Sequence, residues 1–188
     1  MEPESNKTIK KMSSEIELPD GVSAFSAINS LTVKGPKGES TRKLSQHGVS
    51  LRIDNNKIIL EAERQLRKNK KMIGAMNAHI RNMIKGSLQN HAYTLKICSG
   101  HFPMNVSITG NKLVIKNFLG EKVPRTLEFK NGVQVKVDGD LIHVVSNSKE
   151  LAGQVSADIE QLTRRPGYDT RVFQDGCYII SKDGKELK

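Results

Sequence analysis

Residues 113–125, Leu113-Val-Ile-Lys-Asn-Phe-Leu-Gly-Glu-Lys-Val-Pro-Arg125, join an apolar run to a polar turn. The apolar triplet predicts a strand, and the residues after it predict a turn that holds two cations and a glycine. A weaker copy occurs at residues 31–39, where Leu31-Thr-Val-Lys is followed by Gly38-Glu39. The triplet and the Gly-Glu pair both recur 82 residues later. This recurrence indicates that the chain contains one unit twice.

Two further patterns repeat in the same order. Strict alternation of apolar residues predicts a hairpin at 49–61 and another at 133–145. Apolar residues at helical spacing then predict a helix from about residue 68 and a second one that begins at Asn147 or Ser148. Gly86 is expected to end the first helix. Three blocks in one order favour a duplication over chance.

The sequence therefore predicts an α+β fold of two duplicated small domains, each an antiparallel β-sheet packed with one α-helix. Before the first hairpin, residues 27–34 and 40–44 are each expected to form a strand. The predicted organisation is a flexible basic arm at 1–14, an N-terminal domain at 15–90, and a C-terminal domain at 91–188 with an extension from about 168. That extension has no counterpart in the first domain.

The charge of the chain points to a polyanionic partner. Thirty Lys and Arg against twenty Asp and Glu give a net charge of +10 and a pI near 9.6, with cations in both halves. The chain has five Phe, three Tyr and no Trp. Since proteins that bind single-stranded RNA usually stack bases on aromatic side chains, this composition favours contacts to phosphates and groove shape. A structured nucleic acid is the expected partner.

Catalytic and metal-binding patterns are absent from the sequence. No nucleophile or nucleotide-binding motif occurs, and Cys98, Cys177 and the five histidines lack metal-ligand spacing. Asp138, Asp140 and Asp175 stand beside glycines and are expected to be turn residues. We therefore expect no enzymatic activity, no metal and no cofactor. Unpaired cysteines and the lack of a signal peptide or a long apolar stretch predict a soluble cytoplasmic protein without membrane contact.

Basic residues recur at the ends of predicted strands in both units. They are Lys34 and Lys37 in the first unit, and Lys116, Lys122 and Arg125 in the second. A rigid sheet can hold such charges in fixed register against a phosphate backbone. Each residue alone is typical of a solvated surface, but the repeated set predicts a binding edge.

Three motifs occur in order between about residues 14 and 182. They are Leu18-Pro-Asp-Gly21 with Val33-Lys-Gly-Pro-Lys-Gly38; His101-Phe-Pro103 followed by Val114-Ile-Lys-Asn-Phe-Leu-Gly-Glu-Lys122 and Pro124-Arg125; and Arg171-x-Phe-x-Asp-Gly-x-Tyr-Ile with Lys182. Together they resemble the archaeal and eukaryotic form of the large-subunit ribosomal protein L-six family. Cys177 stands where that family usually has an aliphatic residue, and Arg165-Pro166-Gly167 has no close match.

The resemblance implies two duplicated α+β domains and an architectural role on large-subunit rRNA. It places the protein beside the sarcin-ricin loop, near the stalk base where translation factors dock and other large-subunit proteins lie. The residues expected to contact rRNA are Lys116, Asn117, Lys122, Arg125, Arg164, Arg165, Arg171 and Lys182. The alternative is a non-ribosomal protein-interaction module with a basic surface.

Overall fold

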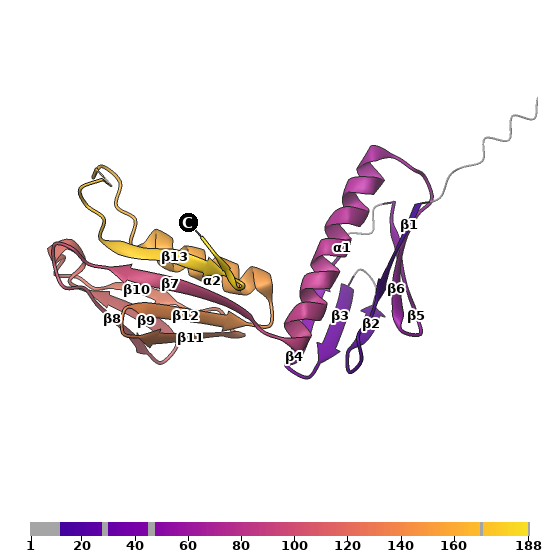
Figure 1. Cartoon of the computed structure of the whole chain (residues 1–188), viewed down its shortest axis with the longest axis horizontal. Helices are drawn as coiled ribbons and strands as arrows, with labels where there is room; N and C mark the ends of the chain where they lie inside the picture. Colours follow the sequence, from indigo (N-terminus) through magenta and orange to yellow (C-terminus); the bar gives the residue numbers. More distant parts are fainter. Residues whose placement is uncertain (1–11, 28–29, 45–47, 170, 188) are drawn as a thin grey trace, which may run out of the picture. The chain divides into compact units, whose positions relative to one another are not determined.

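The structure, a computed structural model, describes residues 12–27, 30–44, 48–169 and 171–187 (Figure 1). They divide into two compact units between Gln89 and Asn90. The first contains β1 (Met12–Glu17), β2 (Ser23–Ala27), β3 (Ser30–Gly35), β4 (Gly38–Lys43), β5 (Ser50–Asp54), β6 (Lys57–Ala62) and α1 (Arg67–Leu88). The second contains β7 (His91–Cys98), β8 (Asn105–Thr109), β9 (Lys112–Lys116), the 3-10 turn η1 (Phe118–Gly120), β10 (Arg125–Glu128), β11 (Val133–Asp138), β12 (Leu141–Ser146), α2 (Lys149–Leu162), β13 (Gly176–Lys182) and β14 (Lys185–Glu186).

The two units share one topology, in which six strands precede a helix. In the first unit the sheets have the orders β1-β6-β5 and β2-β3-β4. In the second, β7-β12-β11 and β8-β9-β10 have the same connections, and all neighbouring strands are antiparallel. The predicted α+β duplication is therefore confirmed. No helix among the described residues is long and apolar enough to cross a membrane.

The main difference between the units lies beside β7. Strand β13 pairs with β7 on the edge opposite β12 and carries β14 with it, which gives a five-stranded sheet. The equivalent strand β1 has β6 as its one neighbour among the described strands. The predicted C-terminal extension thus adds strands that the first unit does not contain in its described part.

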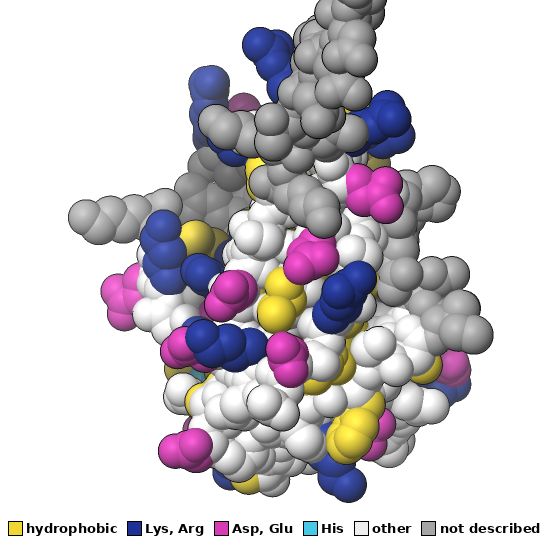
Figure 2. All heavy atoms as spheres, turned by 90° about the vertical axis from the view of Figure 1, so that its right-hand side faces the viewer, with side chains coloured by type: hydrophobic (Ala, Val, Ile, Leu, Met, Phe, Trp, Pro, Cys, Tyr) yellow, Lys and Arg dark blue, Asp and Glu magenta, His cyan; other side chains and the backbone are white. Residues whose placement is uncertain are grey.

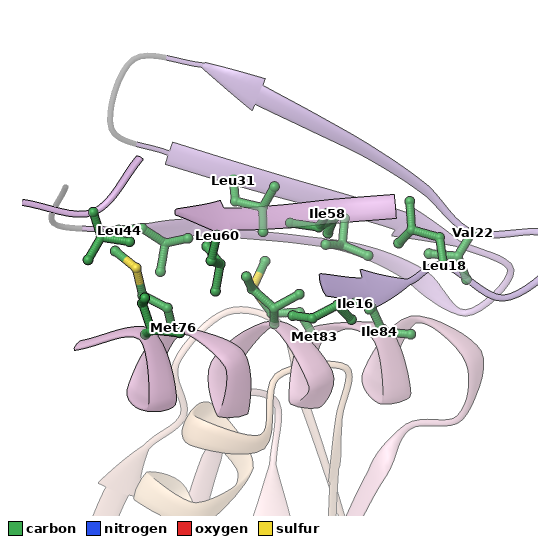
Figure 3. Packing of buried hydrophobic residues seen from close by; sticks show 14 of the residues in the cluster. Ile16, Leu18, Val22, Leu31, Leu44, Ile58, Leu60, Met76, Met83 and Ile84 are labelled. Carbon is green, nitrogen blue, oxygen red and sulfur yellow. The ribbon is translucent and has the colours of Figure 1, made fainter. Parts of the chain in front are cut away.

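The core of the first unit lies between α1 and the two sheets. Met76, Met83 and Ile84 point from the helix toward strand residues such as Leu31 and Leu60 (Figure 3). These strand residues are fully buried. The methionines of α1 are therefore core residues, as an amphipathic helix requires.

The second core is built in the same way but around a shorter helix. Val155 and Ile159 of α2 are buried with Leu95 and Ile142 of the sheet. Ser148 caps the helix, since its Oγ accepts a hydrogen bond from the Leu151 N–H at 3.4 Å. The predicted start of this helix is confirmed.

Several predicted boundaries are wrong. Residues 12–14 belong to β1 and not to a flexible arm, and the rest of the predicted arm, residues 1–11, lies outside the described residues. Residues 27–34 do not form one strand, because β2 ends at Ala27 and β3 begins at Ser30. Strands β1, β2 and β7 were not predicted.

Gly86 does not end α1, which continues to Leu88 with Gly86 buried. The turn between β3 and β4 packs against this last helical turn: the Lys37 N–H donates to the Ser87 carbonyl at 2.9 Å. A Cβ added at Gly35 would lie 2.8 Å from the Ser87 carbonyl oxygen. The close contact of the β3–β4 turn with the last turn of α1 therefore outweighs the local tendency of Gly86 to end the helix.

Replacing Gly35 by Ala should destabilise the first unit by about 1–3 kcal/mol, because the added methyl group meets backbone that must move. Urea unfolding would measure the loss. The matched control is Gly74→Ala on α1, where a Cβ meets nothing within 4 Å. That change should leave stability equal or raise it by about 0.5–1 kcal/mol. Equal stability of Gly35→Ala and the parent would contradict the close contact.

Candidate nucleic-acid interface

The turn after β9 has an unusual backbone that fixes where its side chains lie. Asn117, Leu119 and Gly120 all have positive φ angles, of 60°, 48° and 77°. A positive φ is uncommon for a residue such as Leu119 and costs free energy that the surrounding structure must offset. The Asn117 side-chain amide donates to the Pro103 carbonyl at 3.0 Å, which ties the turn to the loop before β8. The exposed Lys116 and Lys122 flank this turn.

Glu121 holds the turn to the segment after α2. Its carboxylate accepts two hydrogen bonds from Arg125, from Nε at 2.8 Å and from Nη2 at 2.7 Å, and lies 3.5 Å from Nη1 of Arg165. The hydrogen bonds from Arg125 lower the pKa of Glu121. Two of the eight residues expected to contact rRNA are therefore bound by one carboxylate of the same chain.

Arg125 makes further contacts within the fold. Its Nη1 donates to the carbonyl of Leu162 at the end of α2, at 2.5 Å, and its guanidinium lies 4.3 Å from the centroid of the Phe118 ring. Its side chain is only 22% exposed. Arg125 thus joins β10, η1 and α2, and most of its surface faces protein rather than solvent.

Asp175 is a buried anchor, so its prediction as a turn residue is wrong. Its Oδ1 accepts from the backbone N–H groups of Gly100 at 2.6 Å and His101 at 3.0 Å, and its Oδ2 lies 2.6 Å from His101 Nδ1. Burial alone would raise the pKa of Asp175, but these contacts with His101 and Gly100 bring it below the usual value. The carboxylate ties the start of β13 to the loop after β7.

A chain of ring contacts connects this anchor to Glu121. The His101 ring stacks on Phe173 with centroids 4.9 Å apart, and Phe173 meets Tyr168 edge to face at 5.0 Å. The Arg165 guanidinium lies 4.5 Å from the centroid of the Tyr168 ring. The anchor, the rings and the two arginines form a continuous frame, which we define as Asp175, His101, Phe173, Tyr168, Arg165, Glu121, Arg125 and Phe118.

The predicted site residues fall into three groups around this frame. Arg125 and Arg165 are part of it, whereas Lys116, Asn117, Lys122, Arg164 and Arg171 are exposed on the segments that it holds. Lys182 is exposed at the far end of β13, six residues from Gly176, which corresponds to roughly 20 Å along a strand. The structure therefore brings the turn together with residues 164–169 and Arg171 and leaves Lys182 apart.

Charges of both signs lie side by side on the first unit. Figure 2 shows a face on which Lys and Arg alternate with Asp and Glu. Within this unit Lys57 lies 3.6 Å from Glu15 and 3.2 Å from Glu17. Lys34, near the end of β3, and Lys37, in the β3–β4 turn, are both exposed. The second unit has a similar pair between Lys112 and Glu128, so nearby acids do not distinguish the two units as anion-binding surfaces.

Sequence reasoning missed the members of the frame that carry no positive charge. His101 and Asp175 both lie in the motifs that carry the family resemblance, so those motifs could have indicated that both residues matter.

Metal binding has no support in the described ranges, where no three His, Cys, Asp or Glu side chains could hold an ion. Both cysteines are free thiols, and burial raises the pKa of Cys177 to about 12.

Replacing Asp175 by Asn should lower the free energy of unfolding at pH 7 by about 1–3 kcal/mol, since charged hydrogen bonds in a buried site are lost. The folded-state pKa is depressed, so this stabilisation is fully present above the unfolded value near 3.8 and is lost as the pH falls from there through the lower folded-state pKa. Urea unfolding at pH 7 and pH 3 should show the difference between variant and parent shrinking. Asp138→Asn, at the exposed last residue of β11, is the control and should change little; the sequence-based prediction of Asp138 as a turn residue is wrong. An equal effect of both variants would contradict the anchor.

Comparison with known proteins identifies the family. The family model for ribosomal protein L6 matches residues 18–89 and 102–176, one segment in each unit. The large ribosomal subunit protein uL6 of Methanobrevibacter smithii is 44% identical over 169 residues, covering 90% of this chain and 95% of the relative. The uL6 proteins of Methanococcus vannielii (42% over 173 residues, 92% and 95%) and Natronomonas pharaonis (40% over 168 residues, 89% and 95%) are similarly close. The family predicted from the three motifs is confirmed, and it is a family of structural proteins and not of enzymes. The chain belongs to the ribosomal protein L6 family.

Proposed function

We propose that the chain is a structural component of the large subunit of the cytoplasmic ribosome and binds large-subunit rRNA. Family membership and the names of the relatives support the ribosomal role. The net charge of +10 supports an RNA partner, because phosphate neutralisation supplies much of the affinity of such proteins. Its role is architectural: it holds RNA helices in position, and the reaction chemistry lies elsewhere.

The observation that carries the proposed interface is the separation between framework cations and exposed cations. Glu121 pairs with both Arg125 and Arg165, so these two arginines position the backbone of the turn and of the segment after α2. The exposed Lys116 and Lys122 then stand on one held segment, and Arg164 and Arg171 on the other. Charges on rigid segments can contact phosphates with less loss of conformational entropy than charges on free loops.

The expected location is beside the sarcin-ricin loop, near the region where translation factors dock and other large-subunit proteins lie. This part of the proposal is supported by the motifs at residues 101–103, 114–125 and 171–182, which resemble the family's motifs. The frame supports it further, because it draws residues of these three segments into one network. Lys182, at the far end of β13, would contact a different part of the RNA.

The two kinds of cation should respond differently to substitution. Lys122→Ala should weaken binding to a large-subunit rRNA transcript several-fold and lower the slope of log affinity against log salt by about 1, because one phosphate contact is lost. Arg125→Ala should mainly lower the free energy of unfolding, by about 1–3 kcal/mol, because partly buried hydrogen bonds are broken. Filter binding across a salt series and urea unfolding would measure the two effects.

Lys136→Ala is the matched control, since Lys136 is an exposed lysine on β11 outside the predicted set. It should leave both the affinity and the slope near the parent values. Association with large subunits that resists high salt and nuclease would instead support the protein-interaction module. Unchanged affinity and slope for Lys122→Ala would remove this turn from the interface.

The location can be tested separately by hydroxyl-radical footprinting of large subunits assembled with and without the protein. We expect protection of backbone positions at and beside the sarcin-ricin loop, because bound side chains shield the sugars. Subunits assembled with Lys122→Ala should show weaker protection there. Protection confined to other rRNA regions would retain rRNA binding and exclude this location.

A further inference from the structure

A pocket of about 510 Å³ opens in the second unit between the end of α2, the segment 164–168 and the start of β13. Its walls include Phe118, Tyr168, Phe173 and Tyr178. These are four of only eight aromatic residues in the chain. The low aromatic content predicts no stacking platform, but the fold concentrates half of these rings in one place. The volume lies within the range of small-ligand sites, about 300–1,000 Å³.

We propose that this pocket receives one unstacked nucleotide of the bound RNA, with its base against the tyrosine rings and its phosphate beside Arg164. The inference rests on the proposed rRNA binding and adds a base contact to the phosphate contacts described above. Proteins recognise unpaired RNA nucleotides by stacking the base on aromatic rings or on arginine guanidinium planes. Both kinds of surface line this pocket.

The two tyrosines are accessible from solvent. Tyr168 is 42% exposed and Tyr178 is 40% exposed, although both lie in a folded wall. Arg165 lies over the Tyr168 ring, which adds a planar cation beside the aromatic surface. Arg164 lines the same pocket and is exposed, so it can approach a phosphate at the rim.

The wall that carries Tyr178 is rigid. Gly176 has a φ of +155°, and a Cβ added there would lie 3.2 Å from Thr163 Oγ1 and 3.4 Å from the Tyr178 ring. The same hydroxyl oxygen accepts a hydrogen bond from the Cys177 N–H at 2.9 Å. Close packing between the end of α2 and β13 therefore fixes the backbone that carries Tyr178 before any ligand arrives, which reduces the entropy lost on binding.

The acidic residues of the pocket indicate which base it would prefer. Both oxygens of Asp175 are engaged by Gly100 and His101. Glu160 accepts from the Ile179 N–H through Oε1 at 3.3 Å, which leaves its carboxylate with further acceptor capacity. A carboxylate can accept from the exocyclic amino group of a base. Adenine, cytosine and guanine carry that group and uracil does not, so the first three should be preferred.

Affinity for a large-subunit rRNA transcript tests the stacking contact in the full-length protein. Tyr168→Ala and Tyr178→Ala should each weaken binding on the order of ten-fold, within the range found for base-aromatic stacking. Tyr168→Phe, which keeps the ring, should bind within about two-fold of the parent. Phe25→Ala is the matched control because Phe25 is a 60% exposed aromatic residue of the first unit. Urea unfolding would show that the variants compared are folded.

The outcomes separate this inference from the proposed function. If the parent binds the transcript and both Tyr→Ala variants bind equally well, the pocket proposal is overturned and rRNA binding stands. If the parent does not bind the transcript at any salt concentration, the proposed function and this inference both fail. Loss of binding in the Ala variants together with retention in Tyr168→Phe and Phe25→Ala supports the pocket.

Base preference can be measured by NMR titration of the protein with 5′-monophosphates of adenosine, cytidine, guanosine and uridine. Ring signals of Tyr168 and Tyr178 should shift with the first three nucleotides at concentrations where uridine monophosphate and ribose 5-phosphate produce at most half the change. Glu160→Gln should reduce the difference between cytidine and uridine monophosphates. Equal shifts with ribose 5-phosphate would show a phosphate site only and would overturn the base contact.

Discussion

The Glu121 carboxylate joins two parts of the second unit that are distant in sequence. It accepts two hydrogen bonds from Arg125 at the start of β10 and lies close to Arg165 after α2. An ion group of this kind contributes little net stability compared with apolar packing, because its charges must be partly desolvated. Its value lies in geometry, since it fixes the turn and the C-terminal segment in one arrangement. The exposed cations and the aromatic pocket both depend on that arrangement.

The repeated architecture was predictable because its signal is local. Alternating apolar residues mark the hairpins β5–β6 and β11–β12, and the spacing of apolar residues marks both helices. Strand β1 gave almost no such signal, since Ile16 is its one buried side chain among serines and glutamates. Strand β7 does show alternating apolar residues, at Tyr93, Leu95 and Ile97. It was not recognised because it lies at the boundary between the two units.

The site was only partly predictable. The sequence shows which residues carry a charge, but it does not show which of them meet an opposite charge in the fold. Lys122 and Arg125 are equivalent as sequence features, but only Arg125 meets a carboxylate and a helix carbonyl in the fold. Asp175 illustrates the opposite error: the pair Asp-Gly usually marks a turn, and here the carboxylate is buried by residues about 75 positions earlier in the chain. Such contacts follow from the pairing of β13 with β7, which local patterns do not specify.

The position of β13 in the sheet also affects how the protein is made. In the first unit, β1 and β6 pair over at most 50 residues, between Met12 and Ala62. Pairing of β7 with β13 joins Cys98 to Gly176 across 78 residues. A nascent chain folds from its N-terminal side, and long loops are slower to close. The first unit can therefore complete its sheets while the second still has an open edge, and the frame around Asp175 is assembled only after β13 has been synthesised.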